Sequence, residues 1–488
     1  MYHSKNIRKK RAQLFFVYGL MAVAVVVTVV ALVLVMLGYR FNRYDGTIEQ
    51  GGLVQFDSKP SGATVMLDDI TLANRTASKV TAQTGSHTIT MTKDGYTSWR
   101  KDVMVQPGSV LWLNYALLLP TKPTIKTVAT FPAVADAIVS PDRKYVAALP
   151  GANDPSIIVT PLNADEATPT RVTLALPDYT APDEGFQQVF DLVGWDFDGR
   201  YMLVRHVYGE AKEEYLSVDL RGADPVRNIS KSLGVDIRAV EYSLASSNTL
   251  YLLTATHEVR RADLSATTLS GPLITNVESF AQSDRSTVTY TTLANEAMQR
   301  SVGYLTSGAA KPRVARTYTD EGAVPAWFRT GTYYGQDYTV TAHGTTIEIL
   351  RGDVPSSDAS TTPQSVQVAK YDCPSNVTYV DFSPVLDRFV VARCGNDVAT
   401  YDLETLQLAR ATVPADQGQS VQWIDKFHWS STASGNFDFY DFDGTNRQTV
   451  ATGTSVLPAT LSENNKYYYH FAPQPTGVAL VRTKALAD

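Results

Sequence analysis

The chain has 488 residues, of which 44% are hydrophobic and 19% charged, so it can bury several cores and does not have the composition of a disordered protein. Its formal net charge is −6, but the charge is divided unevenly. The five charged residues among the first 13 are all basic, which leaves 38 basic against 49 acidic side chains after them, a net charge of −11. An acidic body of this kind repels nucleic acid and anionic wall polymers, which excludes both as expected partners.

The stretch from Leu14 to Leu37 contains 24 residues and no charge. At about 1.5 Å per residue, a helix of this length crosses a hydrocarbon core of roughly 30 Å. Because the residues before it are basic, the positive-inside rule predicts a cytoplasmic tail over 1–13, a transmembrane helix over 14–38 and an extracytoplasmic remainder. A cleaved signal peptide is the alternative, but its apolar core usually spans only about 7 to 15 residues. We therefore expect an uncleaved single-pass anchor in the plasma membrane of a bacterial envelope, followed by a juxtamembrane linker over 39–50.

Residues 51–120 carry the pattern of a small all-β domain. Apolar side chains alternate with polar ones in 63–67 and again in 88–92, a period of two that is typical of half-buried strands. Gly- and Pro-containing turns separate these runs. The stretch is therefore predicted to form a β-sandwich.

The same stretch resembles the PEGA domain family. Pro60-Ser61-Gly62-Ala63 stands where that family has its name-giving tetrapeptide, and the turn at Gly85-Ser86-His87 and the pair Gly95-Tyr96 followed by Trp99 also fit. The family is found mostly as an extracytoplasmic module beside other domains. The resemblance implies no catalytic residue.

From Thr124 onward a unit of about 40 to 50 residues recurs, and Pro120 and Pro123 mark the junction before it. Each unit has a polar turn, a strongly apolar strand and a further strand, a pattern that predicts the blades of a β-propeller over 121–488. Seven blades are the alternative to eight, since the fifth unit departs most from the pattern. The turns with their following strands begin at Ser140, Phe197, Ser246, Ser283, Thr332, Ser383, Ile424 and Ser462.

The last unit offers three strands and not four. Residues 124–129 form a spare strand at the start of the domain, and pairing it with the last unit removes an open sheet edge. We therefore predict that the two ends of the propeller close on each other. The turns at Ser140-Pro141-Asp142, 195–199 and 441–446 resemble repeats of TolB-like β-propellers.

The only two cysteines, Cys373 and Cys394, are both predicted to lie outside the cell, where disulfides persist. A reactive thiol is the alternative, but neither cysteine has a histidine beside it in the sequence. We expect a structural disulfide between them.

No sequence motif predicts catalytic, cofactor-binding or metal-binding residues. There is no G-x-S-x-G elbow or phosphate-binding glycine loop, and the seven histidines are scattered. The stretches 196–199 and 441–444 resemble calcium loops, but they lack the glutamate that such loops need, and we read them as turns. A site assembled from the carboxylates of several blades is not visible in one sequence.

One long polar loop is the candidate binding loop. It is punctuated by prolines around a tyrosine, a composition typical of exposed binding loops. Its candidate residues are Pro177, Asp178, Tyr179, Asp183 and Glu184.

The favoured interpretation is a membrane-anchored scaffold of the cell envelope whose propeller binds a protein or glycan partner, on the face that carries the cysteines and without turnover. The alternative is a surface hydrolase or lyase of glycan or peptide that uses carboxylates in the propeller mouth. Converging carboxylates with raised pKa values in the central channel favour the enzyme.

Overall fold

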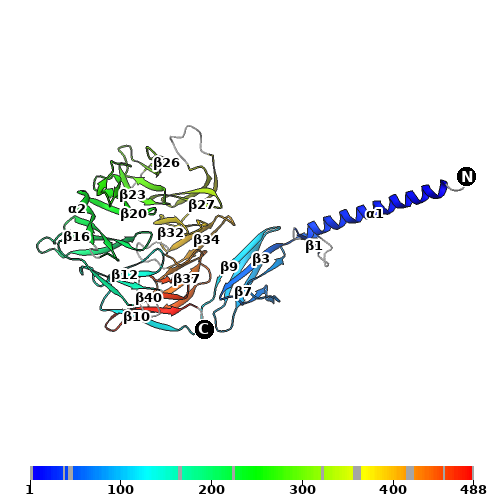
Figure 1. The fold of residues 1–488 in the computed structure, drawn as a ribbon, viewed down its shortest axis with the longest axis horizontal. Helices are drawn as coiled ribbons and strands as arrows, with labels where there is room; N and C mark the ends of the chain where they lie inside the picture. The colour runs from blue at the N-terminus through cyan, green and yellow to red at the C-terminus, as the bar shows by residue number, and fades with distance from the viewer. Residues whose placement is uncertain are drawn as a thin grey trace. The chain divides into compact units, whose positions relative to one another are not determined.

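The computed structural model describes residues 4–36, 39–41, 48–162, 168–222, 226–319, 324–354, 364–413, 422–453 and 457–485. The start of the predicted tail (1–3), the end of the predicted membrane segment (37–38) and half of the predicted linker (42–47) lie outside the described residues. The chain divides into two compact units, 1–122 and 123–488 (Figure 1).

Helix α1 (Ser4–Met36) contains the apolar stretch. Its segment Gln13–Met36 has a mean hydropathy of 3.0 and none of it is buried within the protein, so it is long and apolar enough to cross a membrane. Strands β1 (Tyr39–Phe41) and β2 (Ile48–Gln50) pair antiparallel after it. One N-terminal apolar helix of this kind fits a single-pass anchor.

The remainder of the first unit forms two small sheets, in the orders β6-β3-β9 and β5-β4-β7-β8. In β3 every second residue is buried, as the period of two predicts. The indole of Trp99 is fully buried and meets Tyr115 edge to face at 5.8 Å between ring centroids. The strands are β3 (Gly52–Lys59), β4 (Thr64–Leu67), β5 (Ile70–Thr71), β6 (Ser78–Ala82), β7 (Gly85–Thr92), β8 (Trp99–Val105) and β9 (Val110–Leu117).

Over the described part of the second unit we count eight four-stranded antiparallel sheets, the same number as the repeat units in the sequence. The first strands of neighbouring sheets contact each other, β11 with β15, β15 with β19 and β27 with β31, as they do around the axis of a β-propeller. A short helix, α2 (Ile229–Leu233), follows the second sheet.

The first four sheets contain, in order, β11 (Asp136–Val139), β12 (Tyr145–Leu149), β13 (Ser156–Pro161) and β14 (Thr170–Thr173); β15 (Val189–Trp195), β16 (Tyr201–Gly209), β17 (Lys212–Asp219) and β18 (Val226–Asn228); β19 (Ile237–Ser243), β20 (Ser246–Thr254), β21 (Val259–Asp263) and β22 (Thr268–Leu269); and β23 (Val277–Gln282), β24 (Thr287–Thr292), β25 (Gln299–Thr306) and β26 (Arg313–Thr319).

The next three sheets contain β27 (Ala326–Tyr333), β28 (Gln336–His343), β29 (Thr346–Gly352) and β30 (Ser365–Asp372); β31 (Tyr379–Phe382), β32 (Phe389–Cys394), β33 (Asp397–Asp402) and β34 (Gln407–Thr412); and β35 (Gln422–Trp423), β36 (His428–Ser431), β37 (Asn436–Asp441) and β38 (Gln448–Thr452). The eighth contains β39 (Thr460–Leu461), β40 (Tyr467–Gln474), β41 (Gly477–Lys484) and, from the start of the unit, β10 (Ile125–Phe131).

The predicted closure is confirmed. Strand β10 pairs antiparallel with β41, from Ile125 opposite Thr483 to Phe131 opposite Val478. The first strand of the unit thereby completes its last sheet, and Figure 1 shows β10 beside the C-terminal strands. Without β10, strand β41 would be the exposed edge of a three-stranded sheet, and β10 covers that edge.

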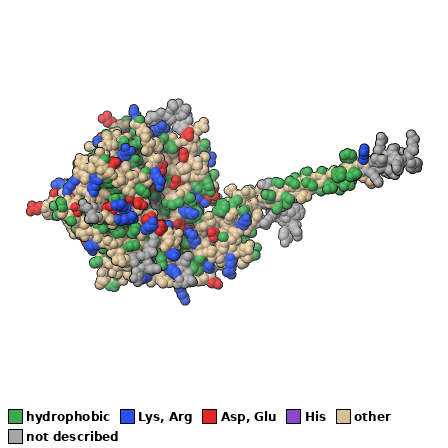
Figure 2. Space-filling view, in the orientation of Figure 1, with side chains coloured by type: hydrophobic (Ala, Val, Ile, Leu, Met, Phe, Trp, Pro, Cys, Tyr) green, Lys and Arg blue, Asp and Glu red, His purple; other side chains and the backbone are tan. Residues whose placement is uncertain are grey.

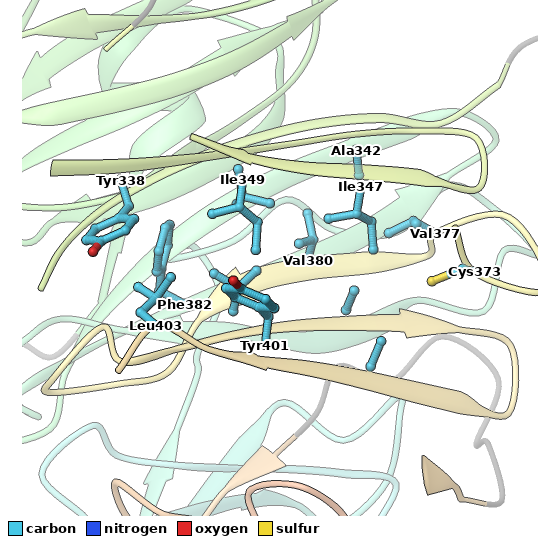
Figure 3. Close-up of a cluster of buried hydrophobic side chains, with 14 of the residues drawn as sticks. Tyr338, Ala342, Ile347, Ile349, Cys373, Val377, Val380, Phe382, Tyr401 and Leu403 are labelled. Atoms are coloured by element: carbon cyan, nitrogen blue, oxygen red, sulfur yellow. The ribbon is translucent and has the colours of Figure 1, made fainter. Parts of the chain in front are cut away.

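The core lies between successive sheets. Ile347 and Ile349 of the fifth sheet and Val380 of the sixth have no exposed surface and point toward one another in Figure 3. Each such residue alternates with one that faces the sheet on the other side, so every strand contributes to two interfaces. This packing holds the turns at the strand ends in place.

Candidate functional site

The strand ends define two faces of the propeller, because consecutive antiparallel connections lie at opposite ends of a sheet. The first-turn face carries the turns from first to second and from third to fourth strand. The second-turn face carries the turns from second to third strand and the connections between sheets.

Both of the sequence-derived candidates lie on the second-turn face. Cys373 lies between β30 and β31, Cys394 ends β32, and the structure joins their sulfurs with the two Cα atoms 6.0 Å apart. The loop from Pro177 to Glu184 connects β14 with β15. Glu184 and Asp183 are exposed there.

We expect labelling of the unreduced, denatured protein to detect no free thiol. In the chain-entropy model a loop of this length, 21 residues apart in sequence, contributes about 3 kcal/mol to the free energy of unfolding. The double variant Cys373→Ser/Cys394→Ser should lose about that amount in a urea titration. Two reactive thiols in the untreated protein would contradict the bridge.

The structure differs from the sequence interpretation at Tyr179, the aromatic residue of the candidate loop. Its side chain is only 7% exposed and meets Phe190 and His206 edge to face, at 5.5 and 4.9 Å between ring centroids. The ring belongs to the core between the first two sheets. The ring of Tyr179 is therefore not presented on the surface of the loop, because Phe190 of β15 and His206 of β16 enclose it.

A buried carboxylate, Glu214, fastens this loop. It accepts hydrogen bonds of 2.6 Å from both the backbone N–H and the hydroxyl of Thr180, one of 2.7 Å from Asn228, and lies 3.0 Å from His206. Burial raises the pKa of Glu214, but the bonds from His206, Thr180 and Asn228 outweigh burial and lower it to about 2. The loop is thus held rigidly on the second sheet.

The first-turn face carries exposed apolar side chains on two neighbouring sheets. We call Tyr334, Val385, Leu386 and Leu406 the apolar turn patch. Tyr334 is 83% exposed and Val385 is 86% exposed. Hydrogen bonds join the segments that bear them: the Thr332 N–H donates to Asp387 at 3.0 Å, and the Tyr333 hydroxyl donates to Glu404 at 3.0 Å.

The backbone at Val385 is unusual, with φ of +78°. A β-branched residue rarely adopts this left-handed region, because its Cβ approaches the following carbonyl. A valine that is both strained and almost fully exposed is not explained by packing. Such residues cluster at functional sites.

Two carboxylates, Glu241 and Asp381, lie on the first strands of the third and sixth sheets, which are the strands nearest the propeller axis. Glu241 of β19 accepts a 3.2 Å bond from the Gln282 N–H, and Asp381 of β31 lies 3.7 Å from Nε of Arg329 on β27. Burial raises the pKa of Glu241 and of Asp381, and the Arg329 guanidinium lowers both without cancelling the effect. The side chain of Asp381 is nevertheless 41% exposed, so its carboxylate reaches solvent.

Sequence reasoning missed Glu241, Arg329 and Asp381, since each comes from a different sheet and no short motif contains them. The apolar turn patch did leave a signal. Val385 and Leu386 follow a proline inside a segment that must turn, where polar residues are usual.

The two stretches that resemble calcium loops use their first carboxylates within the turn. Asp196 accepts 2.8 Å bonds from the N–H groups of Arg200 and Tyr201, and Asp441 accepts one from Asn446. In the part of the chain that is described, no three His, Cys, Asp or Glu side chains are grouped to hold a metal ion.

Stability should depend on pH through a buried histidine between two aspartates. Nδ1 of His428 lies 2.9 Å from Asp425 and Nε2 lies 3.4 Å from Asp441. Burial lowers the pKa of His428, but Asp425 and Asp441 outweigh burial and raise it to about 9 from 6.5. Burial raises the pKa of Asp425, but the charge of His428 and the hydrogen bonds from His428 and the Phe427 N–H outweigh burial and lower it to about 2.

The raised histidine pKa contributes stability that is complete below pH 6.5 and lost as pH rises through about 9. The lowered pKa values of Asp425 and Glu214 contribute stability that is lost as pH falls toward about 2. The buried His470 acts in the opposite direction to His428, because burial lowers its pKa to about 4 and the neutral ring costs stability as pH falls below 6.5. We therefore expect the melting temperature to be highest near pH 6.5. In His428→Gln, which has no titrating ring, the decline between pH 6.5 and 9 should be much shallower; an unchanged slope would contradict the assignment.

Comparison with known proteins gives a family for one part of the chain and a fold for another. Residues 52–119 match the PEGA domain family. No curated protein matches the chain.

Several solved structures share the propeller fold. They include the β-propeller domain of Cps50 (Swd1) from Myceliophteria thermophila, with 8% identity over 75% of this chain and 100% of that chain and a TM-score of 0.40. Apo AztD from Citrobacter koseri has 11% identity over 80% and 96% of the two chains, with a TM-score of 0.39. An oligogalacturonate lyase in complex with manganese has 10% identity over 74% and 98%, with a TM-score of 0.38. These similarities concern the fold and say nothing of activity. Residues 52–119 thus match the PEGA family, and in the chain that domain follows an N-terminal apolar helix and precedes a β-propeller of four-stranded sheets.

Proposed function

We propose that this protein is a membrane-anchored, extracytoplasmic scaffold of the cell envelope, with its N-terminus in the cytoplasm, and that its propeller binds a protein partner through the apolar turn patch. The observation that carries this proposal is the exposure of Val385 in a strained backbone conformation beside Tyr334 and Leu406. Contiguous exposed apolar side chains with a polar surround are typical of protein interfaces.

This proposal moves the binding surface away from the cysteines. Cys394 ends β32, whereas Val385 and Leu386 precede its start at Phe389. Six strand residues at about 3.3 Å each separate the two ends by roughly 20 Å. Apart from Tyr179, which is buried, the candidate loop offers mainly acidic groups. These groups would bind a neutral or basic partner more weakly than the apolar turn patch would bind an apolar surface, because exposed charge pairs contribute little free energy.

Anchoring by α1 supports the proposal in a second way. A tether confines the propeller near the membrane and raises its effective concentration for neighbouring envelope proteins, so a small patch suffices for occupancy. The topology is tested by external protease on spheroplasts, which should digest the propeller and leave the tail. A fully protected propeller would contradict the proposed orientation.

Binding is tested with a photo-crosslinking residue placed at Leu406 in the full chain in its own membrane. We expect a discrete protein adduct from this position. The matched control is the same residue at Met298, which is 52% exposed and lies between β24 and β25 on the second-turn face. Equal adducts from both positions, or none from either, would contradict the proposal.

The variant Val385→Asn separates binding from folding. Asparagine tolerates a positive φ better than valine, so the melting temperature should stay equal or rise slightly. The Leu406 adduct should nevertheless fall at least about fivefold, the effect of losing roughly 1 kcal/mol of apolar contact. Charge reversal of Asp183 and Glu184 should leave the adduct unchanged, and loss of the adduct in that variant alone would assign binding to the loop instead.

A second candidate function, hydrolysis or lyase chemistry on a glycan or peptide, is supported by the raised pKa values of Glu241 and Asp381. A carboxyl group that stays protonated can act as a general acid while a neighbour acts as base. Loss of envelope-glycan or peptide cleavage in both Glu241→Gln and Asp381→Asn, with Val385→Asn fully active, would favour this function over the scaffold.

A further inference from the structure

One end of the PEGA domain is free of charged side chains. Strands β3, β7 and β9 begin at this end and β6 and β8 end there, as the pairing of Gly52 with Ala82 and of Gly85 with Val105 shows. We call it the uncharged end, because no Asp, Glu, Lys or Arg occurs in the segments that form it: 50–56, 82–86 and 103–113. The opposite end, where β3 and β7 finish, carries charged side chains, among them Lys59, Lys93 and Asp94. An end without charge suits a neutral or apolar neighbour.

Three exposed apolar side chains flank the loop that joins β8 to β9 at the uncharged end. Met104 lies before the loop and is 54% exposed, and Val110 and Trp112 lie after it and are 45% and 43% exposed. We call these three residues the corner patch. Along β9, Val110 and Trp112 alternate with Leu111 and Leu113, and Leu113 is buried in the core. Val110 and Trp112 therefore point away from the core, and packing within the domain does not explain them.

A short connection joins the uncharged end to the apolar helix. Only residues 37–38 separate α1 from β1, and β1 pairs with β2 so that Tyr39 lies opposite Gln50. Three chain steps of about 3.8 Å and one strand spacing of about 5 Å limit the distance from the end of α1 to Gln50 to roughly 16 Å. The next residue, Gly51, accepts a hydrogen bond of 3.0 Å from the N–H of Gly108, in the loop between β8 and β9. The uncharged end therefore lies next to the membrane segment.

The membrane–water boundary matches the corner patch in chemistry. The headgroup layer on each side of a bilayer is about 5 to 7 Å thick, enough to receive side chains at the end of a domain. Tryptophan is enriched in this layer, because its ring is apolar and its N–H is polar. Apolar side chains gain free energy on leaving water, and an end without charge loses no ionic hydration. Because α1 holds the bilayer beside the patch, contact with lipid needs no separate encounter, whereas contact with a protein partner does.

We infer that the uncharged end of the PEGA domain docks on the outer leaflet of the membrane that α1 crosses, with Met104, Val110 and Trp112 in the headgroup layer. The inference rests on the proposed anchoring and orientation of the chain. It goes beyond them by giving the PEGA domain a lipid contact of its own. The domain is then held against the membrane surface and does not swing freely on its linker.

The test uses the full chain in nanodiscs of phosphatidylcholine, with a nitroxide on one introduced cysteine and electron paramagnetic resonance as the readout. The native cysteines are bridged, so they do not take up the label. Collisions with oxygen report lipid, and collisions with a water-soluble nickel chelate report water. We expect the oxygen-to-nickel ratio to be higher at Gln106→Cys, in the loop that the corner patch flanks, than at Ser98→Cys. Both positions are exposed, and Ser98 precedes β8 at the opposite end of that strand.

The corner patch itself is tested by the variant Met104→Thr/Val110→Thr/Trp112→Thr with the label at position 106. Threonine suits a strand and is polar, so the melting temperature should change little while the apolar contact is lost. The population in which position 106 is shielded from water should fall at least about tenfold. The matched control replaces three other exposed apolar strand residues with threonine and should leave the ratio unchanged: Ile70, Ile125 and Val366.

A further label, at Val26 in α1, separates this inference from the anchoring on which it rests. If Val26 reports lipid while position 106 has the same ratio as Ser98, the anchor holds and the inference is overturned. Few collisions with either reagent at position 106 would also overturn it, because protein and not lipid would then cover the patch. An unchanged ratio in the triple variant would overturn the role of the corner patch. If Val26 reports water, the anchoring fails and the inference fails with it.

Discussion

Replacing Arg388 with leucine is expected to lower the free energy of unfolding by about 3 to 5 kcal/mol. Arg388 follows the first turn of the sixth sheet and donates to Asp402 through Nε at 2.9 Å and Nη2 at 2.7 Å. Only 9% of the arginine side chain and 5% of the aspartate side chain are exposed. Without the guanidinium, Asp402 is a buried and uncompensated charge, and urea denaturation followed by tryptophan fluorescence should show the loss.

The second sheet provides a matched control. Arg200 also follows a first turn, pairs with Asp219 through the same two nitrogens at 3.0 and 2.6 Å, and stacks on the next aromatic residue as Arg388 does. Its side chain is 41% exposed, so Arg200→Leu should cost only about 0 to 1 kcal/mol. Similar losses in the two variants would show that burial does not set the strength of this repeated pair. Replacing both Arg388 and Asp402 with leucine should recover part of the loss.

Changing Gly477 to alanine is expected to destabilise the propeller by about 3 kcal/mol or more. Gly477 begins β41 with φ of +144°, and a Cβ there would lie 2.1 Å from the carbonyl oxygen of Phe131 and 2.9 Å from that of Pro132. Both oxygens are backbone atoms at the end of β10, so they cannot move away without breaking the pairing that closes the ring. We expect a lower melting temperature and faster proteolysis at the start of the domain, near Thr124.

Gly435, in the turn before β37, is the control for this prediction. It has φ of +72° but no atom within 4 Å of an added Cβ. Gly435→Ala should therefore cost only the conformational penalty of about 1 kcal/mol. If Gly477→Ala were no more harmful than this control, the closing strand would contribute little to the stability of the ring.

The sequence alone determined the features that depend on neighbouring residues. The uncharged run from Leu14 to Leu37 predicts α1 because a membrane-spanning helix is defined by length and composition. The alternation in 63–67 and 88–92 predicts β4 and β7 because side chains alternate along a strand. The closing strand was also predictable, since a count of strands in the last unit shows that one is missing.

Only the tertiary structure decided which side chains face outward. Tyr179 lies in a proline-rich loop that reads as exposed, yet Phe190 and His206, on the following strands β15 and β16, enclose it. Val385 lies in a turn that reads as an ordinary connection, yet its side chain stands in solvent. A period of two tells which residues share a side of a strand but leaves open what covers a loop.

The sites themselves were invisible in the sequence for the same physical reason. Glu241, Arg329 and Asp381 belong to three different sheets. Such groups meet because the ring closes and brings sequence-distant strands together, and their pKa values follow from those surroundings and not from adjacent residues.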